Sequence, residues 1–252
     1  MDQLTYYRDG EMEFYIEAVI PILQDHHSKF DASHDYSHIK RVLNLAKMIQ
    51  DEEKKEDSPT FWRPHIITLG CLLHDVGDKK YQASGKDDIT LARRILCSLP
   101  LLMHPDLPTE VQEIVNHVSY SAEITPGGKE KVQACLAAHP ELAVVQDADR
   151  LDSLGEVGIL RAIAFNAATL KKPIKDAVGH LKGDALKGEM EGTNAQEDAK
   201  EDVEDAAAEH AGKPFRVVGM MKTAAGRKLA EKRLETMKDS IKRHDDEVAL
   251  RA

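Results

Sequence analysis

The chain has 252 residues, of which 42% are hydrophobic and 31% charged, so it is long enough to bury a complete core. Its formal net charge is −10, but residues 183–210 hold ten Asp or Glu against two Lys and carry −8 of that charge, which leaves the remainder nearly neutral. A protein that binds long nucleic acid needs a basic surface, so this balance excludes that class and leaves small anionic substrates.

No stretch of the sequence has the apolar length of a membrane span, and residues 1–10 are polar. We therefore expect a soluble, cytoplasmic protein without a membrane partner; a nuclear location is also compatible. The three cysteines, Cys71, Cys97 and Cys135, form no C-x-x-C pair and lie in apolar helical stretches. We interpret them as reduced residues that contribute to packing.

The first half of the chain has a helical period. Apolar residues recur at steps of three and four over residues 13–23 and 39–49, which predicts two amphipathic helices. Asp31 or Ser33 is the expected N-cap of the second. Residues 64–73 are apolar nearly all round, which is typical of a helix buried in the middle of a bundle.

The period continues to the C-terminus, and further helices are predicted over residues 88–97, from residue 109, over 142–170 and over 220–250. Thr109 and Gln112 have the spacing of a capping box, and the helix over 142–170 should break near Gly155 or Gly158. No stretch alternates as a strand does. The sequence therefore predicts an all-α protein.

The acidic segment interrupts this pattern because it has no apolar face to offset the entropy of ordering its backbone. We therefore divide the chain into a helical core over residues 1–182, an acidic and mobile insertion over 183–212, and a C-terminal helix over 213–252 that packs back on the core.

Several His and Asp residues are set beside apolar helical runs, which forces ionisable groups towards the interior, where they need a partner. A divalent metal ion suits imidazole and carboxylate together, and a bundle core can gather such ligands from separate helices. The residues with ligand potential are His34, Asp35, His38, His74, Asp75, Asp78, His117, Asp147, Asp149 and Asp152.

The order and setting of these residues resemble the HD-domain superfamily of metal-dependent phosphohydrolases. The matching motifs are His38-Ile-Lys-Arg-Val42, Leu72-Leu-His74-Asp75 and Ala148-Asp149-Arg-Leu151. Longer matches over residues 34–42, 74–81 and 146–152 are similar to a subgroup of small bacterial and fungal HD hydrolases, some of which cleave nucleoside triphosphates to monophosphate and pyrophosphate. The similarity runs from about residue 10 to 175 and returns weakly over 221–233. It implies a helical bundle with the metal site in its core.

The resemblance implies that His38, His74, Asp75 and Asp149 bind one divalent metal ion, and Asp147 and Asp152 compete for the role of Asp149. Two imidazoles and two carboxylates, with open positions, suit Mn, Mg, Co, Ni or Fe better than a closed structural zinc site. His74 and Asp75 are thereby catalytic residues. Asp78, one helical turn beyond His74, is expected to be the general base.

The charge of a phosphorylated substrate requires cationic or polar partners close to the metal. The candidates for substrate binding are His34, Arg41, Lys79, Lys80, His117 and Arg150. Salt bridges to neighbouring carboxylates are the alternative role of the cations. His117 is also a candidate ligand of a second metal, or else a hydrogen-bonded core histidine.

The expected function is hydrolysis of a small phosphorylated molecule, a nucleotide, with release of pyrophosphate from a triphosphate. The alternatives are a nucleoside monophosphate phosphatase, an HD-type oxygenase with two irons, and a non-catalytic nucleotide-binding regulator. A metalloprotease is disfavoured because His34 and His38 enclose Asp35 instead of the longer Glu. His244-Asp245, a second His-Asp pair, lies in a charged stretch and is interpreted as a surface feature. The apolar faces are compatible with a homo-oligomer.

Overall fold

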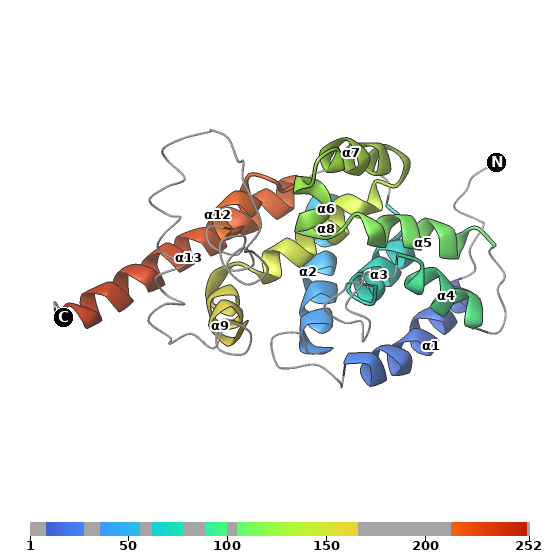
Figure 1. Cartoon of the computed structure of the whole chain (residues 1–252), viewed down its shortest axis with the longest axis horizontal. Helices are drawn as coiled ribbons and strands as arrows, with labels where there is room; N and C mark the ends of the chain where they lie inside the picture. Colours follow the sequence, from blue (N-terminus) through green and yellow to red (C-terminus); the bar gives the residue numbers. More distant parts are fainter. Residues whose placement is uncertain are drawn as a thin grey trace, which may run out of the picture. The chain divides into compact units, whose positions relative to one another are not determined.

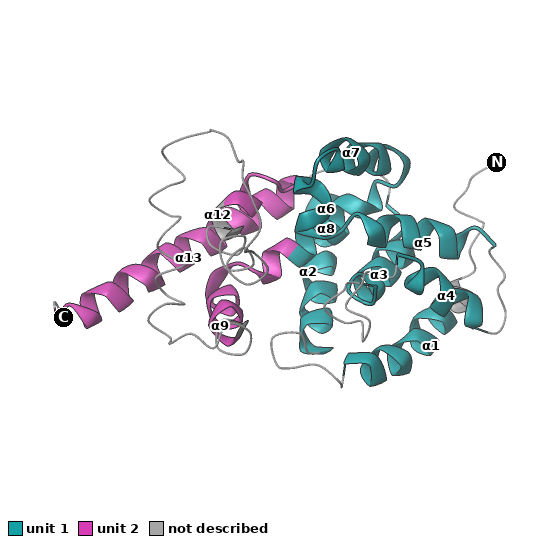
Figure 2. Cartoon of the chain, viewed as in Figure 1, with its two compact units in different colours: residues 1–30, 34–149 teal, residues 31–33, 150–252 magenta. Residues whose placement is uncertain are grey.

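The computed structural model contains only helices as regular elements in the part of the chain that it describes. It divides the chain into two compact units, which Figure 2 colours separately, with residues 1–30 and 34–149 in unit 1 and residues 31–33 and 150–252 in unit 2. The described residues are 9–27, 36–55, 62–77, 89–99, 105–165 and 213–250. None of the helices described is long and apolar enough to cross a membrane.

Unit 1 is a bundle of helices (Figure 1). Its helices are α1 (Asp9–His27), α2 (Tyr36–Lys55), α3 (Pro64–Leu73), α4 (Leu91–Ser98), α5 (Leu107–Asn116), α6 (Tyr120–Ile124), α7 (Gly128–Ala138) and the greater part of α8 (Glu141–Asp152). The predicted helices over 13–23, 39–49, 64–73 and 88–97 correspond to α1 to α4. The sequence did not predict α6 and α7, which are short or carry little apolar periodicity.

Helix α3 lies inside unit 1, as its apolar composition predicts. It packs against α1, α2 and α5, and seven of its ten residues are buried. Pro64 begins the helix, where its missing N–H costs nothing. Gly70 allows α8 to approach closely, since a Cβ at Gly70 would lie 3.1 Å from Cγ2 of Val145. A side chain at residue 70 would therefore crowd Val145 on α8.

An ion-pair network joins the beginnings of α3 and α8. Arg63, the residue before α3, donates from Nε to Oε1 of Glu141, the first residue of α8, at 2.8 Å. Its backbone N–H donates to the same oxygen, and its Nη1 donates to Oε2 of Glu110 at 2.8 Å. Burial alone would lower the pKa of Arg63, but the hydrogen bonds and charges of Glu141 and Glu110 raise it above its ordinary value. We call this network, made of Arg63, Glu110 and Glu141, the clasp.

The beginning of α5 differs from the sequence prediction. The helix starts at Leu107, with Pro108 in its first turn, so Thr109 lies inside it and the predicted capping box is wrong. Gln112 instead accepts a hydrogen bond from the backbone N–H of Arg93 on α4, at 2.8 Å, and donates to Oδ1 of Asn116. The predicted capping box does not form because the helix begins earlier, with Pro108 in its first turn, and because Gln112 accepts its hydrogen bond from the backbone N–H of Arg93 on α4.

Unit 2 begins with the last turn of α8 and contains α9 (Gly155–Phe165), α12 (Lys213–Val218) and α13 (Ala224–Val248). The predicted break lies just before Gly155, whose φ of +75° suits glycine. The predicted C-terminal helix is α13, which packs on α9 and is capped by the Thr223 hydroxyl. The sequence did not predict α12.

The prediction for the three cysteines is confirmed in part. Cys71 and Cys135 are buried and unbonded, as expected, but Cys97 is exposed, so its interpretation as a packing residue is wrong. It lies on the outward face of α4, whose buried residues are Ala92 and Leu96. Asp31, Ser33 and the acidic segment over 183–212 lie outside the described residues.

Candidate metal centre

Four predicted ligands come together in unit 1 from three helices. His38 lies in the first turn of α2, His74 is the C-cap of α3 and Asp75 follows it, and Asp149 lies near the end of α8. The two histidine side chains are buried, with 3% and 2% exposed, whereas those of Asp75 and Asp149 are 17% and 26% exposed. The imidazoles therefore close the inner side of the group, and the carboxylates leave access from solvent.

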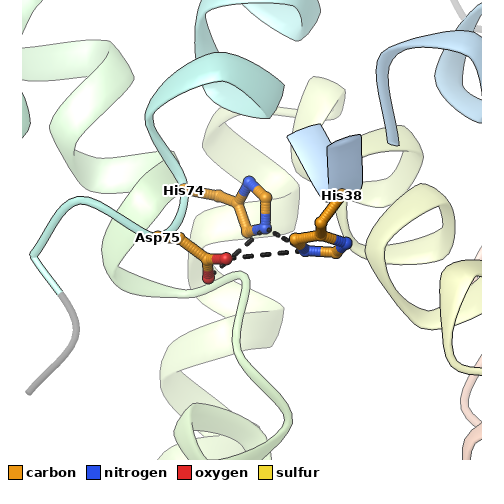
Figure 3. Close-up of side chains that lie close together, drawn as sticks. All are labelled: His38, His74 and Asp75. Carbon is orange, nitrogen blue, oxygen red and sulfur yellow. Dashed lines mark hydrogen bonds and ion pairs between the residues drawn. The ribbon is translucent and has the colours of Figure 1, made fainter. Parts of the chain in front are cut away.

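The polar atoms of the group point towards one another, as Figure 3 shows for His38, His74 and Asp75. The Nε2 atoms of His38 and His74 are 3.2 Å apart. Each also approaches Asp75, since Nε2 of His38 is 3.5 Å from Oδ2 and Nε2 of His74 is 3.4 Å from Oδ1. Oδ1 of Asp149 lies 3.4 Å from Nε2 of His38 and 3.7 Å from Nε2 of His74.

A hydrogen bond to the backbone orients His74. Its Nδ1 is 2.8 Å from the carbonyl oxygen of Cys71, which can only accept, so Nδ1 carries the proton. With this tautomer, a neutral ring presents the lone pair of Nε2 to His38 and the two aspartates. Burial, followed by the charge of Asp149, raises the pKa of the Cys71 thiol, which therefore stays neutral beside the centre.

These four side chains fit a divalent cation. Two ligands bonded at about 2.1 Å to one ion lie about 3.0 Å apart at a right angle and about 3.4 Å apart in a tetrahedron. The five distances above fall close to these values. Acceptor atoms gathered this closely repel one another unless a proton or a cation lies between them, and two carboxylates bring negative charge to a half-buried site. A cation between them relieves both, and the mixed N and O donor set suits Mn, Fe, Co, Ni or Mg.

Asp147 and Asp152, which compete with Asp149 for the ligand role, are more deeply buried than Asp149. Asp152 is buried in unit 2, and its Oδ2 accepts a hydrogen bond from Nη1 of Arg161 at 2.7 Å. Asp147 is completely buried. Asp149 is the member of this trio that approaches both imidazoles, which favours it as the ligand.

The remaining predicted site residues are only partly described. Arg41 is half-buried on α2, one turn after His38. Arg150 is buried, and its Nη1 donates to the backbone oxygen of Met220 at 2.9 Å within unit 2. His34, Asp35, Asp78, Lys79 and Lys80 lie outside the described residues. His244 is 39% exposed and pairs with its neighbour Asp245.

His117 lies in a different group from the one around His74. Its ligand atoms are close to those of Glu113 on α5 and Cys135 on α7. The sequence analysis did not name Glu113, and it interpreted Cys135 only as a packing residue. The spacing of Glu113 and His117, one helical turn, was visible in the sequence, but the approach of Cys135 depends on the packing of α7.

The family comparison identifies one region of the chain. Residues 35–154 match the family model of the HD domain. This range contains all four residues of the candidate metal centre and lies mostly within unit 1.

The chain is also similar to individual proteins over most of its length. It is 29% identical to YpgQ of Bacillus subtilis over 220 residues, which are 86% of this chain and 85% of YpgQ. A crystal structure of YpgQ in complex with ADP superposes with a TM-score of 0.58 at 22% identity, covering 94% of this chain and 96% of that one. An HD-superfamily hydrolase from Bacillus thuringiensis gives a TM-score of 0.56 at 23% identity, covering 94% and 98%.

Proposed function

We propose that this chain, which belongs to the HD-domain superfamily, is a metal-dependent phosphohydrolase that acts on a nucleotide. The observation that carries the proposal is the convergence of His38, His74, Asp75 and Asp149, in which the distances between the two imidazoles and from each imidazole to each carboxylate run from 3.2 to 3.7 Å. In the part of the chain that the structure describes, these donors come from three helices, so the packing of the helices holds them together.

The residues of the centre have distinct roles in this proposal. A divalent ion bound there supplies an acidified water and polarises a phosphoryl oxygen. His38 and His74 hold the ion from the buried side, and the Cys71 carbonyl fixes the ring of His74. Asp75 and Asp149 hold it from the side that remains accessible. We assign to Asp78 the acceptance of the proton from the attacking water.

The proposed substrate is a nucleoside triphosphate. The oxygen of water forms a bond to the α-phosphorus, the bond to the bridging oxygen breaks, and pyrophosphate leaves with the monophosphate as the other product. YpgQ, a similar protein, binds ADP, which supports a nucleotide with more than one phosphate. We propose that Arg41, Lys79, Lys80 and His34 bind its phosphates, and Arg150 and His117 remain weaker candidates because of their positions.

A substrate panel tests this function. The purified protein, stripped of metal and reloaded with Mn, Mg, Co or Ni, is incubated with nucleoside tri-, di- and monophosphates, and both pyrophosphate and inorganic phosphate are measured. Pyrophosphate from triphosphates is the expected result. Inorganic phosphate from monophosphates alone would instead identify a nucleotidase. Nucleotide binding without turnover under any ion would contradict the enzymatic proposal.

Matched variants connect the activity to the centre. His74→Ala and Asp149→Ala should lose both bound metal and turnover, whereas His244→Ala, in the second His-Asp pair, should retain both. Metal content is measured by mass spectrometry of the protein after gel filtration. Full activity with retained metal in Asp149→Ala would show that a different carboxylate binds the ion.

A further inference from the structure

A second group of side chains with ligand potential lies on α5 and α7, and it shares no residue with the first. Glu113 and His117 are one turn apart at the end of α5, and Cys135 faces them from α7. Each offers one ligand atom, and these atoms lie within 4.8 Å of one another. All three line an open cavity of about 680 Å³. We propose that Glu113, His117 and Cys135 bind a thiophilic divalent ion of the zinc class.

The backbone already orients two of the three ligands. Nδ1 of His117 is 2.8 Å from the carbonyl oxygen of Glu113 and therefore carries the proton, which leaves the lone pair on Nε2. The Cys135 thiol donates weakly to the same carbonyl at 3.7 Å. Both residues are thus held at the end of α5, in the way that outer hydrogen bonds orient metal ligands.

The third ligand has room to complete the site. The Glu113 side chain is 50% exposed, and its Oε1 lies 3.8 Å from Nδ1 of His117. Because Nδ1 carries the proton, the ligating nitrogen would be Nε2, and the exposed carboxylate of Glu113 can rotate towards it. The alternative is that Glu113 and His117 form an ion pair within one helix turn, next to a cysteine that only contributes to packing.

The donor set decides between ion classes. Sulfur, imidazole nitrogen and carboxylate oxygen together suit zinc, whereas magnesium and calcium avoid thiolate. A further nitrogen lines the same cavity, since Nδ1 of His139 is buried without a hydrogen-bond partner in the part of the chain that the structure describes. His139 is the C-cap of α7, the helix that carries Cys135.

Metal binding at this group displaces a proton. Burial, with the charge of Glu113, raises the pKa of the Cys135 thiol to about 12, so the sulfur is protonated before the ion arrives. Binding forms the sulfur–metal bond, breaks the S–H bond and releases the proton to solvent. The negative charge of Glu113, which disfavours the thiolate alone, then favours the cation.

Cobalt spectroscopy separates this site from the first centre. Thiolate ligation gives Co²⁺ a sulfur-to-metal charge-transfer absorption, which a centre made of His38, His74, Asp75 and Asp149 does not give. The metal-free, full-length protein is titrated with Co²⁺. We expect the charge-transfer band in the wild type and in His74→Ala, its loss in Cys135→Ser, and its retention in Cys97→Ser, the exposed control.

The proposal would be overturned if the wild type gave no charge-transfer band, or if the band persisted in Cys135→Ser or disappeared in Cys71→Ser instead. Because Cys135 is buried, its substitution can also affect folding, so Glu113→Gln provides a second test at an exposed position. In Glu113→Gln the affinity for Co²⁺, measured from the thiolate charge-transfer band, should fall at least about tenfold. The melting temperature of this variant in the presence of chelator should be unchanged. Unchanged affinity would show that Glu113 is not a ligand and would contradict the site as proposed.

Discussion

Removing the arginine of the clasp should destabilise the fold strongly. In Arg63→Met the carboxylate of Glu141, only 2% exposed, loses its charged partner and keeps one hydrogen bond, from the backbone N–H of residue 63. Breaking one side of a buried ion pair costs about 3 to 5 kcal/mol. Since the Arg63 side chain is 27% exposed, solvent screens part of the charge left behind. We expect a loss near the lower limit, about 3 kcal/mol.

The third member of the clasp provides the matched control. The carboxylate of Glu110 makes one hydrogen bond to Arg63 and is 26% exposed, so water can replace the arginine there. Exposed ion pairs contribute up to about 1 kcal/mol. Glu110→Gln should therefore cost less than about 1 kcal/mol, although it removes a carboxylate at the same distance from Arg63 as Glu141.

The assay is unfolding in urea followed by far-ultraviolet circular dichroism, with chelator present so that bound metal does not contribute to stability. The double variant Arg63→Met/Glu141→Leu removes both charges, and it should recover part of the loss because the clasp then has no buried carboxylate without its arginine. If Arg63→Met costs no more than Glu110→Gln, or if the double variant is the least stable of the set, then the clasp does not act as a buried pair.

Three other predictions concern packing, capping and metal binding. Gly70→Ala places a Cβ 3.1 Å from Val145 and should lower the free energy of unfolding in urea by about 1 kcal/mol. The same substitution should cost less in a Val145→Ala background, and simple addition of the two costs would contradict this contact. Thr223→Ala removes the hydroxyl that caps α13 and should cost about 1 kcal/mol by thermal unfolding, whereas Thr223→Ser should be nearly neutral. A divalent ion at about a hundred times its Kd should stabilise the protein by about 2.7 kcal/mol. Asp149→Asn should reduce this gain, and an equal gain in both proteins would argue against Asp149 as a ligand.

The sequence predicted the interior of the fold better than its boundaries. The all-round apolar composition of residues 64–73 correctly indicated a buried helix, and Gly155 correctly marked the break after α8. Periodicity reports burial directly, which explains this success. Helix caps depend on which donors neighbouring helices offer, and so the capping box at Thr109 was wrong: α4 engages Gln112 from outside the local sequence.

The candidate centre was accessible to prediction because its motifs place ionisable groups at the ends of apolar runs. The resemblance selected His38, His74, Asp75 and Asp149, and these four donors converge in the structure. The group around His117 was not accessible in the same way. Its third member, Cys135, lies on a helix with little apolar periodicity, so nothing local indicated which face of α7 meets α5.

Helices α3 and α8 carry three successive links: Arg63 with Glu141, Gly70 with Val145, and His74 with Asp149. The partners are separated along the chain by a nearly constant number of residues, so the two helices run in the same direction and in fixed register. Inserting one residue between Glu141 and Asp149 would turn the aspartate by about 100° around its helix axis. Natural variation in chain length should therefore be confined to the connections outside these two segments, while the number of residues from clasp to ligand stays constant.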